Sequence, residues 1–454
     1  MFSALHHRNF RLFWFGQIIS VTGTWMQSIG QAWLVLQLTH NAFLLGVVSA
    51  LQFLPVLVLS LVGGVVADKL PKRRLLMFTQ TVAMIQAFAM FALAATGTVR
   101  VWHVMVLAAC LGTVNALDMP TRQAFITEMV GRDDLMNAIS LNSAQFNASR
   151  VVGPGIAGVL IAVLGIPPLF LVNAVSYVAV LVGLAMMDPT RLHAPVGARV
   201  SDRPLRQIRD GVAFAWRTPP IRLALLMIFA VSTFGMNFNI ILPLLAERTF
   251  RTGATGYGVM SSLLGFGSLV AALVLAGTVK RPRVGLLVAS AGAFSVLEIV
   301  LARIQAPIPA YGALALIGFA TIAFAATANT LLQTNSPDAM RGRVMALYSM
   351  LFAGSTPIGA LAIGALAGRV GASGALFIGA LPCLAAVAYG ASVWRATAAF
   401  RAPGGTVAPD VEADSGPAAS QRAAPGTLAP DGAPAVSPAA IALPSAAEPA
   451  SRSA

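Results

Sequence analysis

Charged residues are scarce in this sequence. Asp, Glu, Lys and Arg make up only 10% of its 454 residues, against roughly one quarter in a soluble globular domain. Residues 18–67, 75–99 and 156–187 contain no charge at all. Each stretch exceeds the roughly 20 residues that one helix needs to cross the hydrocarbon core of a bilayer. The scarcity of charge therefore excludes a water-facing globular fold and indicates a chain embedded in the lipid bilayer.

Cysteine is also rare, and motifs for chemistry are missing. Cys110 and Cys383 lie far apart within apolar stretches and lack metal-ligand or redox spacing, so we interpret both as packing residues. The sequence has no Gly-rich phosphate loop with a following Lys and Ser/Thr, no His-Glu-x-x-His and no Gly-x-Ser-x-Gly. We therefore expect no direct use of ATP, no enzymatic activity, no metal site and no cofactor.

The apolar stretches predict an all-α membrane protein with twelve transmembrane helices. The alternation of apolar and polar residues that marks a membrane β-barrel is absent, and a lone helix satisfies all its backbone hydrogen bonds in lipid. The predicted spans are residues 12–38, 42–67, 75–96, 102–124, 137–163, 168–188, 221–246, 257–279, 284–303, 310–332, 343–369 and 372–395. They form two sets of six.

The net charge of +14 comes from an uneven distribution of Lys and Arg. Of these 30 residues, 24 fall on one side of the predicted spans and Arg150 lies inside one. The five on the other side are Arg100, Arg248, Arg251, Arg303 and Arg369. Since basic loops stay in the cytoplasm, both termini are predicted to be cytoplasmic, in a multi-pass protein of the bacterial inner membrane. No basic stripe interleaved with aromatic residues points to nucleic acid.

The spacing of the spans predicts four regions. Residues 1–188 form an N-terminal six-helix half, 189–220 an Arg-rich cytoplasmic linker that is partly an amphipathic surface helix, and 221–395 a C-terminal half. Residues 396–454 are rich in Ala, Pro, Gly and Ser, which predicts a disordered cytoplasmic tail.

The two halves are related by an internal repeat. Gly46-Val-Val-Ser-Ala-Leu aligns with Gly258-Val-Met-Ser-Ser-Leu, and the pair Gly153 and Gly158 aligns with Gly359 and Gly364. Parallel six-helix repeats of this kind are typical of a large class of carriers whose binding site lies between the halves near the bilayer midplane.

The loop after the second span carries the first family signature. Its sequence, Gly63-Gly-Val-Val-Ala-Asp68-Lys-Leu-Pro-Lys72-Arg73-Arg, resembles the signature loop of the major facilitator superfamily, although Pro71 stands where that family usually has Gly. The resemblance implies a cytoplasmic latch built from Gly64, Asp68, Lys72 and Arg73. A plain basic loop would explain the cations alone, but neither Asp68 nor the paired glycines.

A second signature lies in the fifth span. Arg150-Val-Val-Gly153-Pro154-Gly-Ile-Ala-Gly158 resembles the superfamily's antiporter motif, with Ala157 in place of the first Gly of its small pair. Pro154 interrupts the helical hydrogen-bond ladder, so a kink with close packing at Gly153 and Gly158 is expected. The alternative is a generic kink without a role in transport.

The longest match joins Asp118-Met-Pro-Thr-Arg122 to the Arg150 motif, through Glu128-Met-Val-Gly-Arg132 and Asn137. With Trp25-Met-Gln27 and Arg341-Gly-Arg343-Val-Met-Ala-Leu, it resembles the branch of the superfamily that contains the enterobactin exporter and carriers of macrolides and other drugs. The resemblance spans residues 8–395 and implies export of an organic solute.

Polar residues inside the spans follow helical faces. Gln17, Ser20, Thr24, Gln27 and Gln31 recur every three or four residues in the first span, and Ser143, Asn147, Arg150 and Pro154 do so in the fifth. These stripes line a polar pathway or join helices by hydrogen bonds worth about 0.6 kcal/mol each.

A charge near mid-span costs at least about 2.5 kcal/mol, so Arg150 is expected to face a wet cavity or a partner. We predict that it binds an anionic group of the substrate. The predicted substrate pathway comprises Gln27, Gln31, Asn147, Arg150, Asn237 and Asn239. Trp25, Phe146 and Phe234 are predicted to supply apolar contacts.

Two acidic residues lie within the spans. Asp118 pairs either with Arg150, as a proton-exchanging residue in the cavity, or with Arg122 and the 72–74 loop, as a cytoplasmic gate; the sequence leaves both open, with the gate slightly favoured. Glu298 lies five residues before Arg303 and is expected to form a structural ion pair with it.

These features predict a monomeric secondary transporter that couples proton movement to efflux of a siderophore-like or drug-like organic solute by alternating access. Uptake of a small metabolite by symport is the alternative within the same mechanism. A non-transporting membrane receptor or scaffold on the same fold is the alternative from another class.

Overall fold

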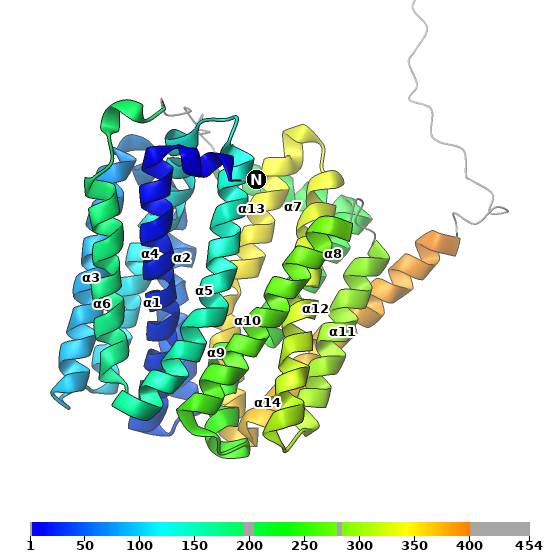
Figure 1. Cartoon of the computed structure of the whole chain (residues 1–454). Helices are drawn as coiled ribbons and strands as arrows, with labels where there is room; N and C mark the ends of the chain where they lie inside the picture. Colours follow the sequence, from blue (N-terminus) through cyan, green and yellow to red (C-terminus); the bar gives the residue numbers. More distant parts are fainter. Residues whose placement is uncertain (1, 194–203, 279–283, 400–454) are drawn as a thin grey trace, which may run out of the picture. The chain divides into compact units, whose positions relative to one another are not determined.

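A computed structural model of the chain describes residues 2–193, 204–278 and 284–399. Within these ranges the regular elements are all helical (Figure 1). The first half contains α1 (Arg8–Thr39), α2 (Ala42–Lys69), α3 (Lys72–Ala95), α4 (Val101–Val130), α5 (Leu135–Leu164) and α6 (Pro167–Ala185). The second contains α8 (Pro219–Ala230), α9 (Phe238–Leu244), α10 (Gly253–Thr278), α11 (Val284–Arg303), α12 (Pro307–Thr334), α13 (Asp338–Gly354) and α14 (Thr356–Ala399). The predicted tail lies outside the described residues from 400 onward.

The prediction of twelve spans in two six-helix halves is confirmed. Ten stretches of the described residues are long and apolar enough to cross a membrane. One of them, Met340–Trp394, holds two spans, because Gly371 adopts φ +76° and breaks α14 at a backbone conformation that favours glycine. α1 (Arg8–Thr39) supplies the remaining span, which is long enough to cross a membrane but more polar because of its glutamines.

Two predicted spans are interrupted rather than continuous. The seventh consists of α8, a π-helical turn at Val231–Gly235, α9 and a second π-helical turn at Leu245–Thr249. The eleventh breaks between α13 and α14, where Pro357 occupies the first turn of the new helix. Proline lacks a backbone N–H and is tolerated there, so the sequence restarts the helix instead of continuing it.

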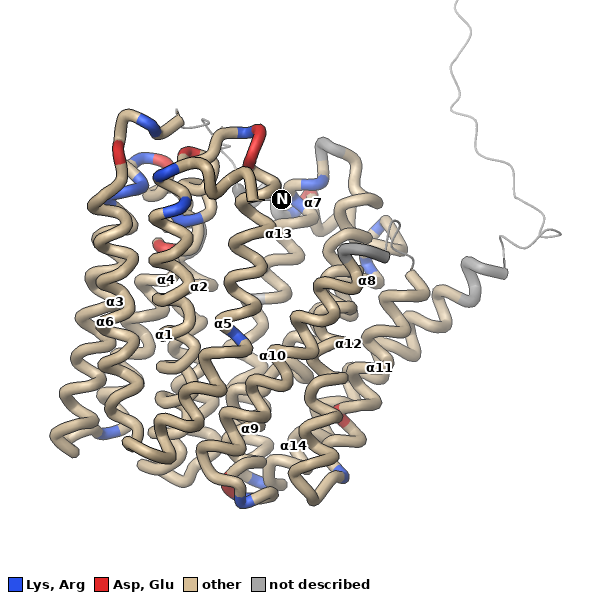
Figure 2. The backbone as a smooth tube through the Cα atoms, in the orientation of Figure 1, with Lys and Arg blue, Asp and Glu red and all other residues tan. Residues whose placement is uncertain are grey.

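The two ends of the bundle differ in charge. Figure 2 shows Lys and Arg gathered at the end that carries the N-terminus, which we call the basic end, and few at the opposite end, the far end. The basic end includes the start of α1 and the α2–α3 loop; the far end includes the α1–α2 loop at His40. This asymmetry underlies the predicted cytoplasmic location of the basic end.

Two contacts tie the start of α1 to its neighbours at the basic end. His7 Nε2 lies 2.8 Å from Asp134, and Asn9 bonds the backbone of Asp188. Hydrogen bonds from Ser3 and His7 lower the pKa of Asp134, and those from Thr190 lower the pKa of Asp188. Because folding lowers both pKa values, these contacts stabilise the fold above the ordinary carboxyl range and are lost on acidification.

The linker region contains the predicted helix, α7 (Pro204–Arg217). It packs on α13, where Asp210 lies 3.5 Å from Arg343 and Gly211 lies directly against the Arg343 side chain. Residues 194–203 of the linker lie outside the described residues. α7 is therefore bound to a transmembrane helix of the second half, at the basic end.

The internal repeat reappears as two equivalent contacts between the halves. Gly46 of α2 faces Gly364 of α14, and a Cβ on Gly46 would lie 2.4 Å from the Ala360 carbonyl oxygen. Gly258 of α10 faces Gly158 of α5, and its Cβ would lie 2.6 Å from the Pro154 carbonyl oxygen. Gly46 is equivalent to Gly258 in the repeat, and Gly364 to Gly158, so the two contacts are equivalent. A pseudo-two-fold axis between the halves requires this equivalence. We call these two contacts the glycine seal.

The adjacent glycines Gly63 and Gly64 differ in how closely they pack, so substituting each should affect stability differently. A Cβ on Gly63 would lie 2.1 Å from the Ala116 carbonyl oxygen of α4, whereas one on Gly64 would meet nothing within 4 Å. Gly63→Ala is therefore expected to cost about 1–3 kcal/mol by overpacking, and Gly64→Ala to be neutral. Thermal unfolding in detergent measures both; equal melting temperatures would contradict the α2–α4 packing.

Candidate functional site: a polar cavity with a buried ion pair

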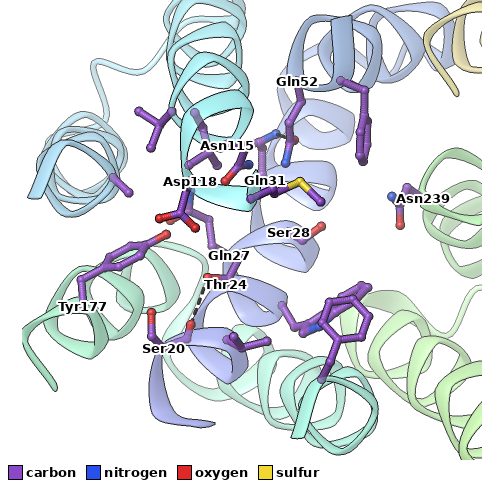
Figure 3. A pocket seen from close by; sticks show the side chains of 18 of the residues that line it. Ser20, Thr24, Gln27, Ser28, Gln31, Gln52, Asn115, Asp118, Tyr177 and Asn239 are labelled. Carbon is purple, nitrogen blue, oxygen red and sulfur yellow. Dashed lines mark hydrogen bonds between the residues drawn. The ribbon is translucent and has the colours of Figure 1, made fainter. Parts of the chain in front are cut away.

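A cavity of about 520 Å³ lies mainly within the first half of the molecule (Figure 3). Side chains of α1, α2, α4 and α5 line it, together with Gln80 and Ala83 of α3 and Tyr177 of α6. Its size suits a drug-sized ligand. Among the described residues Asn239 of α9 is the one lining residue from the second half, and it faces the cavity from the side opposite to Asp118 in Figure 3.

Asp118 and Arg122 form an ion pair in the cavity wall. The Asp118 side chain is almost fully buried; its Oδ2 accepts from Arg122 Nε at 3.0 Å and from Nη2 at 2.5 Å. Its Oδ1 accepts from Thr79 Oγ1 and Gln80 Nε2, both at 2.8 Å. Arg122 also donates through Nη1 to Gln17. Side chains of α3 and α4 thus converge on one carboxylate, and α1 is joined to the pair through Arg122.

Of the two alternatives for Asp118, the structure contains its pairing with Arg122. It does not contain the pairing with Arg150. Arg150 is absent from the cavity wall and stacks on the ring of Trp25, with its Cζ 5.8 Å from the ring centroid. The backbone of Arg150 lies on the side of α5 that packs against α10, where Gly265 is next to the Arg150 carbonyl oxygen.

The other predicted pathway residues separate into two groups. Gln27, Gln31 and Asn239 line the cavity. Asn147 bonds the Ser143 carbonyl of its own helix, and Asn237 bonds that of Thr233 and faces Gly359 of α14. Trp25 and Phe146 line the cavity in an edge-to-face pair, whereas Phe234 does not. The lining residues include six amides that the prediction omitted: Gln52, Gln80, Asn115, Gln123, Asn142 and Gln145.

A signal for two of these omissions exists in the sequence. Asn115, Met119 and Gln123 are spaced four residues apart, which places them on one face of α4. That stripe is analogous to the stripes in the first and fifth spans.

The antiporter-like motif serves helix packing on two sides. A Cβ on Gly153 would lie 2.7 Å from the Cβ of Trp25, so this residue lets α5 approach α1. Gly158 faces α10 in the glycine seal. Pro154 lies inside α5, which continues as one helix from Leu135 to Leu164.

The predicted latch residues are not in contact with one another. Asp68 is exposed and has no hydrogen bond or ion pair among the described residues. Lys72 Nζ pairs instead with Glu128 of α4 at 2.8 Å, and Arg73 donates to the Leu184 and Ala185 carbonyls at the C-terminus of α6. These basic residues join α3 to α4 and α6 in this conformation.

The Lys72–Glu128 pair is expected to be essential for stability. Both side chains are about nine-tenths buried, so removing one partner leaves an uncompensated charge. Lys72→Met is expected to cost about 3–5 kcal/mol, while Lys72→Met with Glu128→Leu recovers most of it. Denaturation in detergent with a double-mutant cycle measures the coupling. Additive effects would show that the two side chains do not interact.

Glu298 does not form the predicted pair with Arg303. Its side chain is fully buried, and neither carboxyl oxygen has a hydrogen-bond partner among the described residues. Arg303 lies over the Phe377 ring, 5.2 Å from its centroid. Five residues correspond to about 500° of helical rotation, so the two side chains leave α11 on different faces.

Contacts at the far end close the cavity on that side. Trp33 of α1 stacks on Tyr257 of α10 at 6.1 Å. Arg248 Nη2 donates to the His40 carbonyl at 2.5 Å, and His40 lies 3.4 Å from Glu247. These residues join the first half to the second next to the glycine seal. The ion pair and the cavity therefore lie on the basic side of a closed interface.

Comparison with known proteins agrees with this architecture. The sequence profile of the family described as transmembrane secretion effector matches residues 1–418. The chain is 29% identical over 360 residues to the staphyloferrin A transporter of Staphylococcus aureus, covering 77% of this chain and 87% of that protein. It is 28% identical over 378 residues to the multidrug efflux pump Tap of Mycolicibacterium fortuitum, covering 82% and 92%. It is 24% identical to the enterobactin exporter EntS of Shigella boydii, covering 79% and 85%.

Solved structures share the fold at low sequence identity. The nucleoside transporter NupG superposes with a TM-score of 0.68 at 12% identity, covering 85% of this chain and 99% of NupG. A bacterial homologue of the iron transporter ferroportin, in an inward-facing state, superposes with a TM-score of 0.62 at 17% identity, covering 86% and 98%. From these matches and its two six-helix halves, the chain belongs to the transmembrane secretion effector family of the major facilitator superfamily and is a multi-pass membrane transporter, not an enzyme.

Proposed function

We propose that the protein exports an organic solute from the cytoplasm across the bacterial inner membrane by proton-coupled alternating access. The observation that carries this proposal is a drug-sized polar cavity closed at the far end, with an ion pair in its wall. Relatives named as a multidrug efflux pump and an enterobactin exporter support the outward direction.

The orientation rests on charge. The basic end carries the α2–α3 loop with Lys72, Arg73 and Arg74, and basic loops are retained in the cytoplasm. With that end inside, the cavity is cut off from the exterior and the conformation is inward-facing. The two termini are then cytoplasmic, and a solute enters the cavity from the cytoplasm.

Proton coupling is assigned to Asp118. It is the one carboxylate among the described lining residues. Its ion pair with Arg122 lies within α4, and hydrogen bonds from Thr79 and Gln80 join it to α3. Protonation would neutralise Asp118 and release the Arg122 guanidinium. This change in the cavity wall would alter the relative free energies of the inward-facing and outward-facing conformations. An incoming proton and an outgoing solute would then use the cavity in turn.

Flux in reconstituted vesicles tests the proposal. Purified protein in proteoliposomes is given an imposed pH gradient, and movement of a panel of fluorescent organic solutes is followed in both orientations. Gradient-dependent transport from the basic side to the far side supports export. Transport in the opposite direction indicates symport, and binding without transport indicates a receptor.

A further inference from the structure

We infer that the transported solute is uncharged and is recognised through hydrogen bonds to unpaired amide side chains. This inference rests on the proposed export function, which it extends by naming the chemical class of the substrate. It states which cavity side chains contact the solute, and it replaces the expectation that Arg150 binds an anionic group.

The charges in the cavity wall already have partners within the protein. Asp118 and Arg122 are the two charged side chains among the described lining residues, and they pair with each other. The carboxylate accepts four hydrogen bonds, two from Arg122 and one each from Thr79 and Gln80. While Asp118 is ionised and paired with Arg122, an ionic group on the solute would enter without a free counter-charge, and desolvating it uncompensated is costly.

Most other amides of the cavity fall into two sets; Gln145, which also lines it, is buried and its Oε1 has no hydrogen-bond partner among the described residues. Gln27 bonds Gln86 and Asn173, and Gln31 bonds Gln52, at 2.7–3.1 Å. These amides connect α1 with α2, α3 and α6, so they hold the first half together.

The second set forms no hydrogen bonds within the part of the chain that the structure describes. We define the unpaired amides as Asn115 and Gln123 of α4, Asn142 of α5 and Asn239 of α9; they line the cavity, none is fully buried, and none has a hydrogen-bond partner among the described residues. Each carries two donors and one acceptor. Together they present neutral donors and acceptors to a solute from three helices, and Asn239 does so from the second half of the molecule.

An apolar contact accompanies the amides. Trp25 and Phe146 line the cavity as an edge-to-face pair with ring centroids 5.7 Å apart, and Phe146 is half exposed. Aromatic side chains supply apolar contact to ligands in such pockets. The cavity thus suits a solute that combines an apolar body with several amide, hydroxamate or hydroxyl groups, none of them ionised.

A matched series of probes tests the inference. The probe is a metal-free linear trihydroxamate at pH 7 whose terminal amine is free (+1), acetylated (0) or succinylated (−1). Binding to the purified full-length protein is measured by calorimetry. The acetylated probe is expected to bind at least tenfold more tightly than either charged one. Equal affinities, or a preference for the succinylated or free-amine probe, would overturn the inference.

Paired variants separate binding from stability. Asn142→Leu removes an unpaired amide. It is expected to weaken the affinity for the acetylated probe roughly two- to tenfold and to leave the melting temperature unchanged. Gln31→Leu removes a bonded amide and is expected to lower the melting temperature. The reverse pattern would overturn the division of the amides. If none of the three probes binds while vesicles still export other solutes, the substrate class is wrong and export stands; if no solute is exported, the export function itself fails.

Discussion

Asp118→Asn is expected to reduce gradient-driven transport at least tenfold. The asparagine can still accept from Thr79 and Gln80, but it places an uncharged group opposite Arg122 and cannot release a proton. Losing a charge-assisted hydrogen bond is worth about 1.5–3 kcal/mol, which is about ten- to a hundredfold in an equilibrium constant. Flux in proteoliposomes, with and without an imposed pH gradient, measures the effect.

The double variant Asp118→Asn, Arg122→Gln distinguishes proton coupling from a structural ion pair. Removing both charges relieves the uncompensated cation, so the melting temperature is expected to return toward that of the unmodified protein. Solute exchange without a gradient should then persist, while gradient-driven accumulation stays lost. Full gradient-driven transport in the double variant would refute a coupling role for Asp118.

Gly364→Leu is expected to abolish most transport by opening the glycine seal. A Cβ on Gly364 would already lie 3.0 Å from the Ala42 carbonyl oxygen and 3.1 Å from Gly46 Cα, so the larger side chain separates α14 from α2. Overpacking costs about 1–3 kcal/mol, which shifts the equilibrium between the closed and open far end by about five- to 150-fold. The transport rate in vesicles is the first readout.

Accessibility of the cavity is the second readout, and Gly368 provides the control. A Cβ on Gly368, one helical turn along α14, would meet nothing within 4 Å. With Cys110 and Cys383 replaced by Ala, a Ser49→Cys reporter in the cavity wall should react with an impermeant thiol reagent from the far side in the Gly364→Leu protein. It should stay protected with Gly368→Leu. Equal labelling in both proteins would contradict the seal.

Much of the fold could be predicted because bilayer thickness and backbone hydrogen bonding fix the length and type of each span. The glycine repeat was informative for the same reason: glycines at which two backbones meet must recur at equivalent places when two halves are related by symmetry. The breaks in the seventh and eleventh spans were missed, since hydropathy stays high through Val231–Gly235 and through Ser355.

The site was predicted less well, because sequence gives the height of a residue in the membrane but not the direction its side chain takes. Arg150 was expected at the cavity and instead stacks on Trp25 beside α10. Glu298 was predicted to pair with Arg303, the nearest arginine in sequence, but the two side chains lie on different faces of α11. The Lys72–Glu128 pair joins two helices across the fold, a contact that no local pattern encodes. Gln27 and Gln31, in contrast, line the cavity, and their part in a substrate pathway stays a prediction.

Accumulation of solute in inside-out membrane vesicles tests proton-coupled export most directly. In these vesicles the basic end of the unmodified protein faces the medium. The vesicles are energised so that their interior becomes acidic, and the uptake of a fluorescent organic solute is recorded. We expect uptake that begins on energisation, collapses when a protonophore is added and is absent with Asp118→Asn. Uptake that ignores the protonophore, or that persists in the Asp118→Asn protein, would contradict proton-coupled export through this cavity.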